Sequence, residues 1–424
     1  MEGGIEMPQS TMSSRERIRA VIARKPVDHL PLCFEGLGHP WPAFLVRRFP
    51  DRYERVSFML GLGLDAGLVV QPPRFSLQDF ELNELTRPYP DMEVDSAVFS
   101  HAPLGVDPGC ATKSWSQREA GEEHPLLFRE YRTPAGTLRQ VVRRHEYPYE
   151  AVSLTNDLNI PVSRSREHLV KGEADLEALS YILRPPTAAQ LGPYREEMKK
   201  ARRFCDERGV LLAGRSQGIG DVMFWLSGPE AVLMMALDNP QALHRYVEVV
   251  SRWNDERLAI QAEAGADLVI RRGWYESCDF WSPDLYDTFL FPCLKKEVDT
   301  LHAAGVLVSY SMNSGAVPLL PAFRRLGFDI YSNIDPALPG TDLATIKGEV
   351  GDVLTLYGGV NNFGVIEHGS PAEVRAAVFE AVRVLGAGGG YILGPGDTLD
   401  CLLASPEITE KNFSVMIEAW KERR

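Results

Sequence analysis

The sequence lacks paired cysteines, long apolar runs and a basic surplus, and each absence excludes a class of protein. Its six cysteines are scattered without a C-x-x-C pair, which argues against a disulfide scaffold or a structural zinc site and favours a reducing compartment. No uncharged apolar run reaches the roughly 20 residues of a membrane span. The net charge of −13 argues against nucleic acid or an anionic membrane as partner. The start, MEGGIEMPQSTMSS, has no basic and apolar regions, so we expect no signal peptide and a cytoplasmic location.

The sequence has instead a regular alternation of short apolar runs and amphipathic segments. One unit begins with Ala266 to Arg271, which has the β-branched composition of a buried strand. Ser282 and Pro283 then predict the start of a helix, and Gly305 predicts its end. A second buried strand, Val306 to Tyr310, follows. Strands joined in this way are parallel, and ligands bind beyond the carboxyl ends of such strands.

Eight segments have the pattern of a buried strand, and helical segments separate most of them. They lie near Leu30, Leu68, Leu211, Leu268, Val306, Ile330, Leu354 and Ile392. This rhythm predicts an α/β fold, a (β/α)8 TIM barrel that forms a single domain over residues 1–424. Residues 76–185 are rich in proline, charge and short alternating runs, so we expect an inserted antiparallel or cap region there. The rival, an open doubly wound sheet, needs a phosphate fingerprint after its first strand, and we find none.

Several longer stretches are together characteristic of one family. They are SSRERIRAVIARKPVDHLPL, HLVKGEADLEAL, SGPEAVLMMALDNPQALHRYVEVV, LATIKGEVGDVLTLYGGVNNFGVIEHGSPAEVRAAVFEAV and GGGYILGPGDTLD. With these stretches the chain resembles the uroporphyrinogen decarboxylase superfamily over most of its length outside 76–185. The resemblance implies a (β/α)8 barrel with its pocket at the carboxyl ends of the strands. It also implies one of two activities, which are cofactor-free decarboxylation of a tetrapyrrole or corrinoid-dependent methyl transfer.

The chain departs from both branches of this family at the residues that carry their chemistry. True decarboxylases have an arginine-rich loop after the first strand and a catalytic aspartate after the second, whereas this chain has FEGLGHPWP and Gln71. The methyltransferase branch binds zinc through His-x-Cys and a later cysteine. Here those positions resemble Met312 to Ser314 and Asp397, so all three usual ligands are absent. The resemblance is therefore closer to the methyltransferase-like branch, without its zinc site.

The resulting prediction is an enzyme that moves a methyl group from a small methylated substrate to a corrinoid (cobalamin) cofactor, as an O-demethylase or related demethylase does. The chain has no D-x-H-x-x-G cobalamin motif, so the corrinoid is expected on a partner protein. One alternative is a cofactor-free decarboxylase of a small carboxylate. Another is a barrel used as a non-catalytic binding subunit. The substrate, the metal and the oligomeric state stay open, a homodimer included.

The predicted catalytic residues are polar side chains that follow strands. Glu276 lies in an aromatic loop and is predicted to be a general acid, a base or a metal ligand, the alternative being an ion pair with Arg271 or Arg272. Asn313 and Asp397 stand where the family has ligands, with a turn or N-cap role as the alternative.

The remaining candidates line the same predicted strand ends. His39, in the loop GLGHPWP, is a further catalytic candidate unless it is simply a surface residue. A divalent metal is predicted at Glu276, Cys278 and Asp397, although most lone cysteines only pack. The loop around Trp274 suits an apolar pocket, with aromatic packing as the alternative. The predicted substrate contacts are Trp274, Tyr275, Gln217, Tyr310, Met312, Ser314 and Asn361.

Overall fold

The computed structural model describes residues 11–38, 42–70, 109–122, 126–143, 165–186, 188–399 and 405–423. The chain divides into two compact units. The first contains Met1–Val69, Lys200–Ala213 and Leu307–Arg424, and the second contains Val70–Lys199 and Gly214–Val306. In the described ranges, no helix has the length and apolarity needed to cross a membrane. Two candidates from the sequence, His39 and Gln71, lie outside the described residues.

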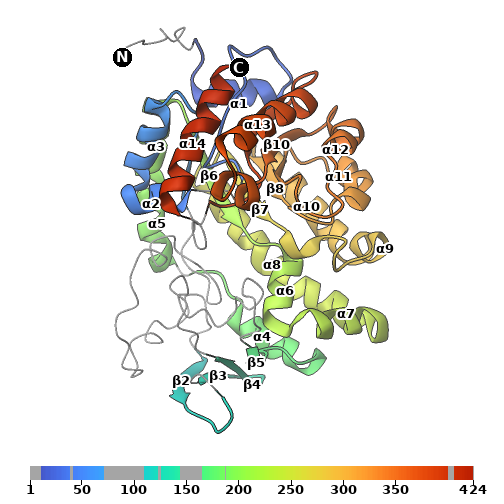
Figure 1. Ribbon diagram of the computed structural model, residues 1–424. Coiled ribbons are helices and arrows are strands. Elements are labelled where there is room, and N and C mark those ends of the chain that lie inside the picture. The colour runs from blue at the N-terminus through green and yellow to red at the C-terminus, as the bar shows by residue number, and fades with distance from the viewer. Residues whose placement is uncertain are drawn as a thin grey trace. The chain divides into compact units, whose positions relative to one another are not determined.

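A seven-stranded sheet with the order β1-β6-β7-β8-β9-β10-β11 forms the centre of the fold (Figure 1). Neighbouring strands such as β8 and β9, or β10 and β11, pair in parallel. The strands are β1 (Gly67–Val69), β6 (Leu211–Ser216), β7 (Leu268–Arg272), β8 (Leu307–Ser311), β9 (Ile330–Ile334), β10 (Thr355–Val360) and β11 (Tyr391–Pro395). Seven of the eight predicted strands therefore occur where the apolar runs placed them, and the α/β class is confirmed.

The eighth predicted strand, near Leu30, forms only isolated β-bridges. They connect it to β11 and to the residues just before β1, the last and first strands in the sheet order. Leu32 pairs in parallel with Leu393 of β11, and Cys33 pairs with Asp65 just before β1. The backbone N–H groups of Cys33 and Asp65 donate to Leu393 and Leu32 at 3.0 and 2.9 Å. The segment ends at Gly36, which turns with φ +99° and where a Cβ would lie 2.2 Å from the carbonyl oxygen of Gly67.

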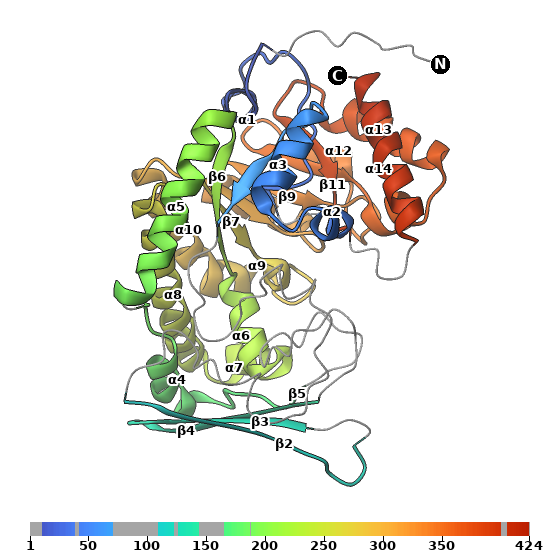
Figure 2. The ribbon, with the colours of Figure 1, turned by 90° about the vertical axis from the view of Figure 1, so that its left-hand side faces the viewer.

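Two helices of the first unit begin at capping boxes. Ser13 and Glu16 form a capping box at α1, and Ser370 and Glu373 form another at α13. Helices α13 and α14 lie side by side in both views (Figures 1 and 2). The helices are α1 (Ser14–Ile22), α2 (Ala43–Arg48), α3 (Arg52–Gly61), α11 (Leu320–Leu326), α12 (Leu343–Val350), α13 (Pro371–Leu385) and α14 (Pro406–Lys421), with a 3₁₀ turn η4 (Val317–Leu319) and a π-helical turn η5 (Asn362–Glu367).

The second unit contains an antiparallel sheet, as the sequence predicted for part of 76–185. Its four strands follow the order β2-β3-β4-β5, and α4 lies against β3 and β4 (Figure 2). Trp115 stacks on Phe128 with ring centres 4.9 Å apart, beside the apolar cluster of Leu126, Phe128 and Val141. The strands are β2 (Ala111–Gln117), β3 (Leu126–Thr133), β4 (Gly136–Arg143) and β5 (Ser165–Glu167).

The helices of this unit include one that the sequence did not indicate, α6. Its first residues belong to the glycine-containing stretch GRSQGIGD, which has the composition of a loop. Helix α5 contains Pro193 in its first turns. Its residues from Lys200 onward belong to the first unit. The elements are η1 (Glu173–Asp175), α4 (Leu176–Ile182), α5 (Ala188–Arg208), α6 (Ile219–Ser227), α7 (Pro229–Asp238), α8 (Pro240–Glu263), η2 (Trp274–Glu276), α9 (Pro283–Leu285), the π-helical turn η3 (Tyr286–Leu290) and α10 (Phe291–Ala303).

Candidate functional site

Four acidic and amide side chains of the first unit follow the carboxyl ends of consecutive strands, and we call them the acid–amide cluster. Asn313, Asp335, Asn361 and Asp397 come after β8, β9, β10 and β11 in turn. The Nδ2 group of Asn313 donates to Asp397 at 3.2 Å. The Nδ2 group of Asn361 donates to both oxygens of Asp335, at 3.0 and 2.8 Å. The structure therefore brings the predicted residues Asn313 and Asp397 into contact and adds Asp335, which the sequence reading missed.

The local backbone holds Asp335 and Asn361 in place. Asn361 caps η5, because its Oδ1 accepts the N–H of Gly364 at 2.6 Å. Asp335 accepts the N–H of Ala337 at 2.9 Å. Burial raises the pKa of Asp335 above its ordinary value, while its hydrogen bonds oppose the rise. A Cβ at Gly396 would lie 2.6 Å from the Cβ of Asp335, so that position requires glycine.

The other predicted contacts of the first unit differ in exposure. Ser314 is half-buried beside Asn313. Met312 is fully buried, and Tyr310 is 1% exposed with its ring 5.5 and 5.4 Å from those of Phe323 and Phe328. Tyr310 therefore belongs to the aromatic core of this unit. The roles of these three residues toward a substrate stay predictions.

In the second unit Glu276 lies in a buried ion cluster with Arg271 and Glu297. Arg271 donates from Nη1 and Nη2 to Glu276 at 2.5 and 3.1 Å, and from Nε to Glu297 at 2.6 Å. The N–H of Gly220 also donates to Glu276, at 3.0 Å. Asn254 joins the cluster to the loop before α6 by donating to Glu297 at 3.2 Å and to the carbonyl of Gln217 at 2.7 Å.

This geometry corresponds to the ion-paired alternative for Glu276. Its side chain is fully buried, and both carboxylate oxygens accept hydrogen bonds within the unit. The acid, base and metal roles predicted for Glu276 stay predictions. Burial, with a smaller effect of Asp279, raises the pKa of the half-buried Cys278 thiol, which disfavours the thiolate that metals and electrophiles need. In the described ranges, no group of three or more His, Cys, Asp or Glu side chains is arranged to hold a metal ion.

Two buried charges lie next to this cluster: Asp221, which was not singled out from the sequence, and Arg272, which the sequence suggested only as a possible ion-pair partner of Glu276. Asp221, in the first turn of α6, is fully buried and accepts the N–H of Tyr275 at 2.8 Å. Burial raises its pKa to about 6, although Arg272 opposes the rise. Arg272 ends β7 and is 9% exposed. An arginine as the last residue of a buried strand is the signal that could have identified this position.

The aromatic loop after β7 is organised around Trp281. The Trp281 ring stacks on Phe224 at 5.5 Å, and its Nε1 donates to the carbonyl of Tyr275 at 2.8 Å. Trp274, Tyr275 and the predicted contact Gln217 are each half-buried. This loop is therefore partly aromatic packing, in which Trp274 and Tyr275 stay half-buried.

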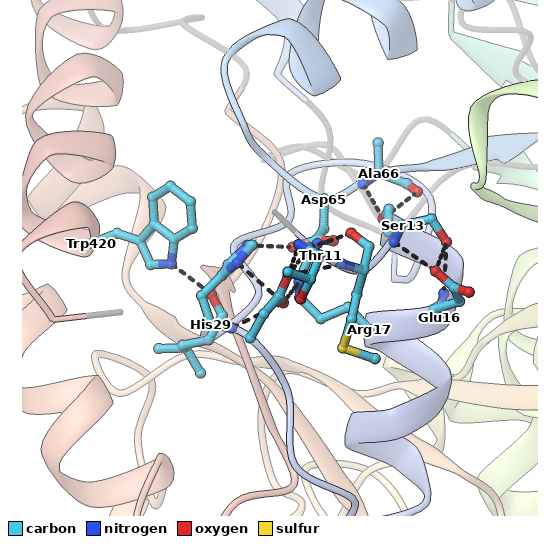
Figure 3. A network of polar contacts seen from close by, with 12 residues as sticks. Thr11, Ser13, Glu16, Arg17, His29, Asp65, Ala66 and Trp420 are labelled. Carbon is cyan, nitrogen blue, oxygen red and sulfur yellow. Dashed lines mark hydrogen bonds and ion pairs between the residues drawn. The ribbon is translucent and has the colours of Figure 1, made fainter. Parts of the chain in front are cut away.

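A third polar cluster lies at the amino-terminal side of the first unit's strands (Figure 3). Arg17 donates to Asp28 at 2.7 Å and to Asp65 at 2.6 Å, and Nδ1 of His29 lies 3.3 Å from Asp28. The indole of Trp420 donates to the carbonyl of Leu30 at 2.7 Å. Burial raises the pKa of Asp65 to about 6, and Arg17 opposes the rise. This end of a parallel α/β sheet serves stability, so we assign this cluster a structural role.

Comparison with known proteins gives one family. The model of the family "Uroporphyrinogen decarboxylase (URO-D)" matches residues 159–423. The uroporphyrinogen decarboxylase of Ectopseudomonas mendocina is 22% identical, over 73% of this chain and 92% of its own length. That of Alkalilimnicola ehrlichii is 23% identical, over 73% and 89%. A solved methyltransferase from Methanosarcina mazei has a TM-score of 0.57 at 16% identity, covering 97% of this chain and 99% of its own, which shows a shared fold.

Proposed function

We propose, because this chain belongs to the uroporphyrinogen decarboxylase family, that it is an enzyme which transfers a methyl group from a small methylated substrate to a corrinoid on a partner protein. The observation that carries the proposal is the charge of the acid–amide cluster. It contains two carboxylates and two carboxamides. A porphyrinogen with its many carboxylates would be repelled by such a site, whereas a neutral or singly charged methyl donor would not.

The fold and the sequence support the same choice. The solved structure titled a methyltransferase covers nearly the whole chain, whereas the curated decarboxylases match 73% of it. The loop FEGLGHPWP has no arginine, and Gln71 stands near the position of the decarboxylase aspartate. We further propose that residues 31–35 act as the eighth strand of a (β/α)8 barrel, since they hydrogen-bond to β11 on one side and to residues 65–67 on the other.

In the proposed reaction the bond between the methyl carbon and its heteroatom breaks, and the heteroatom takes up a proton. The corrinoid would supply the nucleophile that accepts the methyl group. Asp335 suits the role of proton donor, because burial raises its pKa above the ordinary value and so favours its protonated form. Asn313 would donate a hydrogen bond to the leaving atom, and Asp397 would orient Asn313. The described residues do not form a donor set that fits a metal ion, so we assign no step to one.

Decarboxylation of a small carboxylate is the second candidate. The curated relatives are named for decarboxylation, and Arg272 ends a strand with N–H groups that no described residue accepts. In that case the chain would release carbon dioxide from such an acid without any corrinoid. A barrel that only binds its ligand is the third alternative, and it would turn over neither kind of substrate.

One assay separates these candidates. The full chain is incubated with cob(I)alamin and a panel of methoxylated, methylamino and methylthio donors, and separately with uroporphyrinogen. We expect loss of cob(I)alamin together with a demethylated product, and no coproporphyrinogen. Asp335→Asn should lower the rate by about 10²–10⁴-fold, the usual contribution of general acid catalysis. The exposed Asp352→Asn is the control and should keep the rate. Coproporphyrinogen formed at an enzymatic rate would overturn the proposal.

A further inference from the structure

Strand β9 of the first unit contains one residue more than the strand it pairs with. Tyr331 of β9 pairs with Leu356 of β10. The next pair joins Ile334 to Gly358, so β9 has two residues between these pairs where β10 has one. This two-against-one arrangement is a β-bulge, and bulges redirect the side chains that follow them. The bulge lies directly before Asp335, the proposed proton donor.

Asn333, the second residue of the bulge, has an unusual backbone conformation. Its φ is +68°, in the left-handed region, and the residue is fully buried. In the part of the chain that the structure describes, Arg24, in the turn after α1, is the other non-glycine residue with a positive φ. Glycine and asparagine tolerate this region best. On the facing strand, Gly358 has φ +127°, and a Cβ there would lie 2.7 Å from the carbonyl oxygen of Ile334.

The side chains before the bulge define the two sides of β9. Tyr331 packs on Phe323 of α11, with ring centres 5.3 Å apart. Ser332 lies on the opposite side, where its hydroxyl is 2.7 Å from that of Ser311 in β8. Side chains alternate between the two sides of a regular strand. Asp335 is an even number of residues after Tyr331, so a regular strand would direct it to the α11 side.

Asp335 lies instead on the side of Ser332. A Cβ at Gly396 would be 2.6 Å from the Cβ of Asp335, although Gly396 follows β11, two strands away. Strands two positions apart in a sheet are separated by about 9–10 Å, so this approach requires the concave side of the curled sheet. Ser332 is on that side too, because a Cβ at Gly38, beyond β11, would lie 3.0 Å from its Cβ. The extra residue of the bulge accounts for the change of side.

We infer that Asn333 is a positioning residue, whose left-handed backbone directs Asp335 to the concave side of the sheet and toward Asn361. This inference rests on the proposed function and deepens it, because it names the residue that places the proton donor. Asn361 then holds the carboxyl group of Asp335 with hydrogen bonds of 3.0 and 2.8 Å. Since Asn333 acts through its backbone, its side-chain amide is not required for this role.

Substitutions at position 333 separate the backbone role from a side-chain role. Asn333→Gly removes the amide and keeps access to positive φ, so methyl transfer should stay within about threefold of the original rate. Asn333→Val favours a regular strand, so it should lower kcat by about 10²-fold or more, with little change in KM. Asn333→Ala should fall between the two. Thr355→Val, at a buried β10 position that pairs regularly with Ile330, is the control and should keep the rate.

A double-mutant cycle shows whether Asn333 acts through Asp335. In an Asp335→Asn background, Asn333→Val should lower kcat by less than about twofold further, because the group that it misplaces is already gone. Losses that multiply in the double variant would overturn the inference. Equal losses in Asn333→Gly and Asn333→Ala would also overturn it, because the side-chain amide would then be what matters. This second comparison remains decisive even if Asn333→Val folds poorly.

Crystal structures of the same variants give a readout that does not depend on activity. We expect the hydrogen bonds between Asp335 and Asn361 to persist in Asn333→Gly and to be lost in Asn333→Val. An Asn333→Val structure that retains them overturns the inference, whatever the chain catalyses. Loss of these bonds in Asn333→Val, together with an unaltered chain that transfers no methyl group, removes the proposed function and leaves the placement of Asp335 by Asn333 standing.

Discussion

Glu276 shows how strongly the surroundings of one residue decide its role. It follows a strand, as catalytic residues of parallel α/β folds do, yet Arg271 and the backbone of Gly220 engage both of its oxygens. Asp335 follows the next strand but one and accepts only amide donors, from Asn361 and Ala337. Burial raises the pKa of Asp335, although these hydrogen bonds oppose the rise, and the raised pKa favours the protonated form that a proton donor needs.

Glu276→Gln should therefore act on stability. The change replaces two charge-assisted hydrogen bonds from Arg271 with weaker neutral contacts, while the Gly220 bond can remain. We expect the free energy of unfolding to fall by about 2 kcal/mol, measured by urea unfolding. The exposed Asp284→Asn, in the same loop region, should leave the unfolding midpoint unchanged. A Glu276→Gln variant that keeps its urea-unfolding midpoint and loses methyl transfer would instead show that Glu276 takes part in the reaction.

The residues of the candidate site could be predicted only in part. Asn313, Asn361 and Asp397 follow strands in the sequence, and the structure joins each of them to a carboxylate or carboxamide. Asp335 also follows a strand, in FDIYSNIDP, but nothing local indicates that Asn361 will contact it from 26 positions away. Asp221 was not predicted, because its burial depends on the packing of α6 against η2, which lies more than 50 residues away in the sequence.

Secondary-structure elements were easier to predict, since their signals are local. Apolar runs identified the strands, and the capping boxes that begin α1 and α13 are signals of the same local kind. Helix α6 was not predicted, because its start contains two glycines and has no side-chain N-cap, so the sequence has no helix-start signal there. It is buried at every position, so it shows no polar face and no helical periodicity.

The amino-terminal side of the first unit depends on Arg17 of α1, which links this helix to Asp28 and to Asp65 before β1 (Figure 3). Arg17→Met should lower the free energy of unfolding by about 3–5 kcal/mol at pH 8, because it leaves the buried carboxylate of Asp65 and the partly exposed one of Asp28 without their cation. At pH 5 the loss should be smaller, since Asp65, with a pKa of about 6, is then largely protonated and needs no cation.

Urea unfolding at the two pH values measures this effect. Arg383→Met, which breaks an ion pair exposed on both sides, is the matched control and should leave the midpoint unchanged at both. An Arg17→Met variant that loses the same stability at pH 5 as at pH 8 would mean that packing, and not charge, is what Arg17 contributes.

At the scale of the whole molecule, the two carboxyl groups with pKa values of about 6 set an unusual dependence of stability on pH. Asp65 and Asp221 are buried and bind protons more tightly in the folded chain than in the unfolded one. Their contribution is therefore greatest at low pH and declines as the pH rises through about 6. Exposed carboxyls such as Glu373 and Asp352 have lowered pKa values, so their contribution is already complete above pH ~5 and does not change up to pH 8.

The free energy of unfolding should consequently fall as the pH rises from 5 to 8, by about 1 kcal/mol for each of the two groups. Asp221→Asn keeps an oxygen for the Tyr275 N–H and removes one titrating group, so it should make this slope shallower. Asp352→Asn should leave the slope unchanged, because that group titrates well below this range. Urea unfolding at pH 5, 6, 7 and 8 provides the measurement. A stability that rises across this range would show that Asp65 and Asp221 are ionised throughout it, with Arg17 and Arg272 fully compensating their burial.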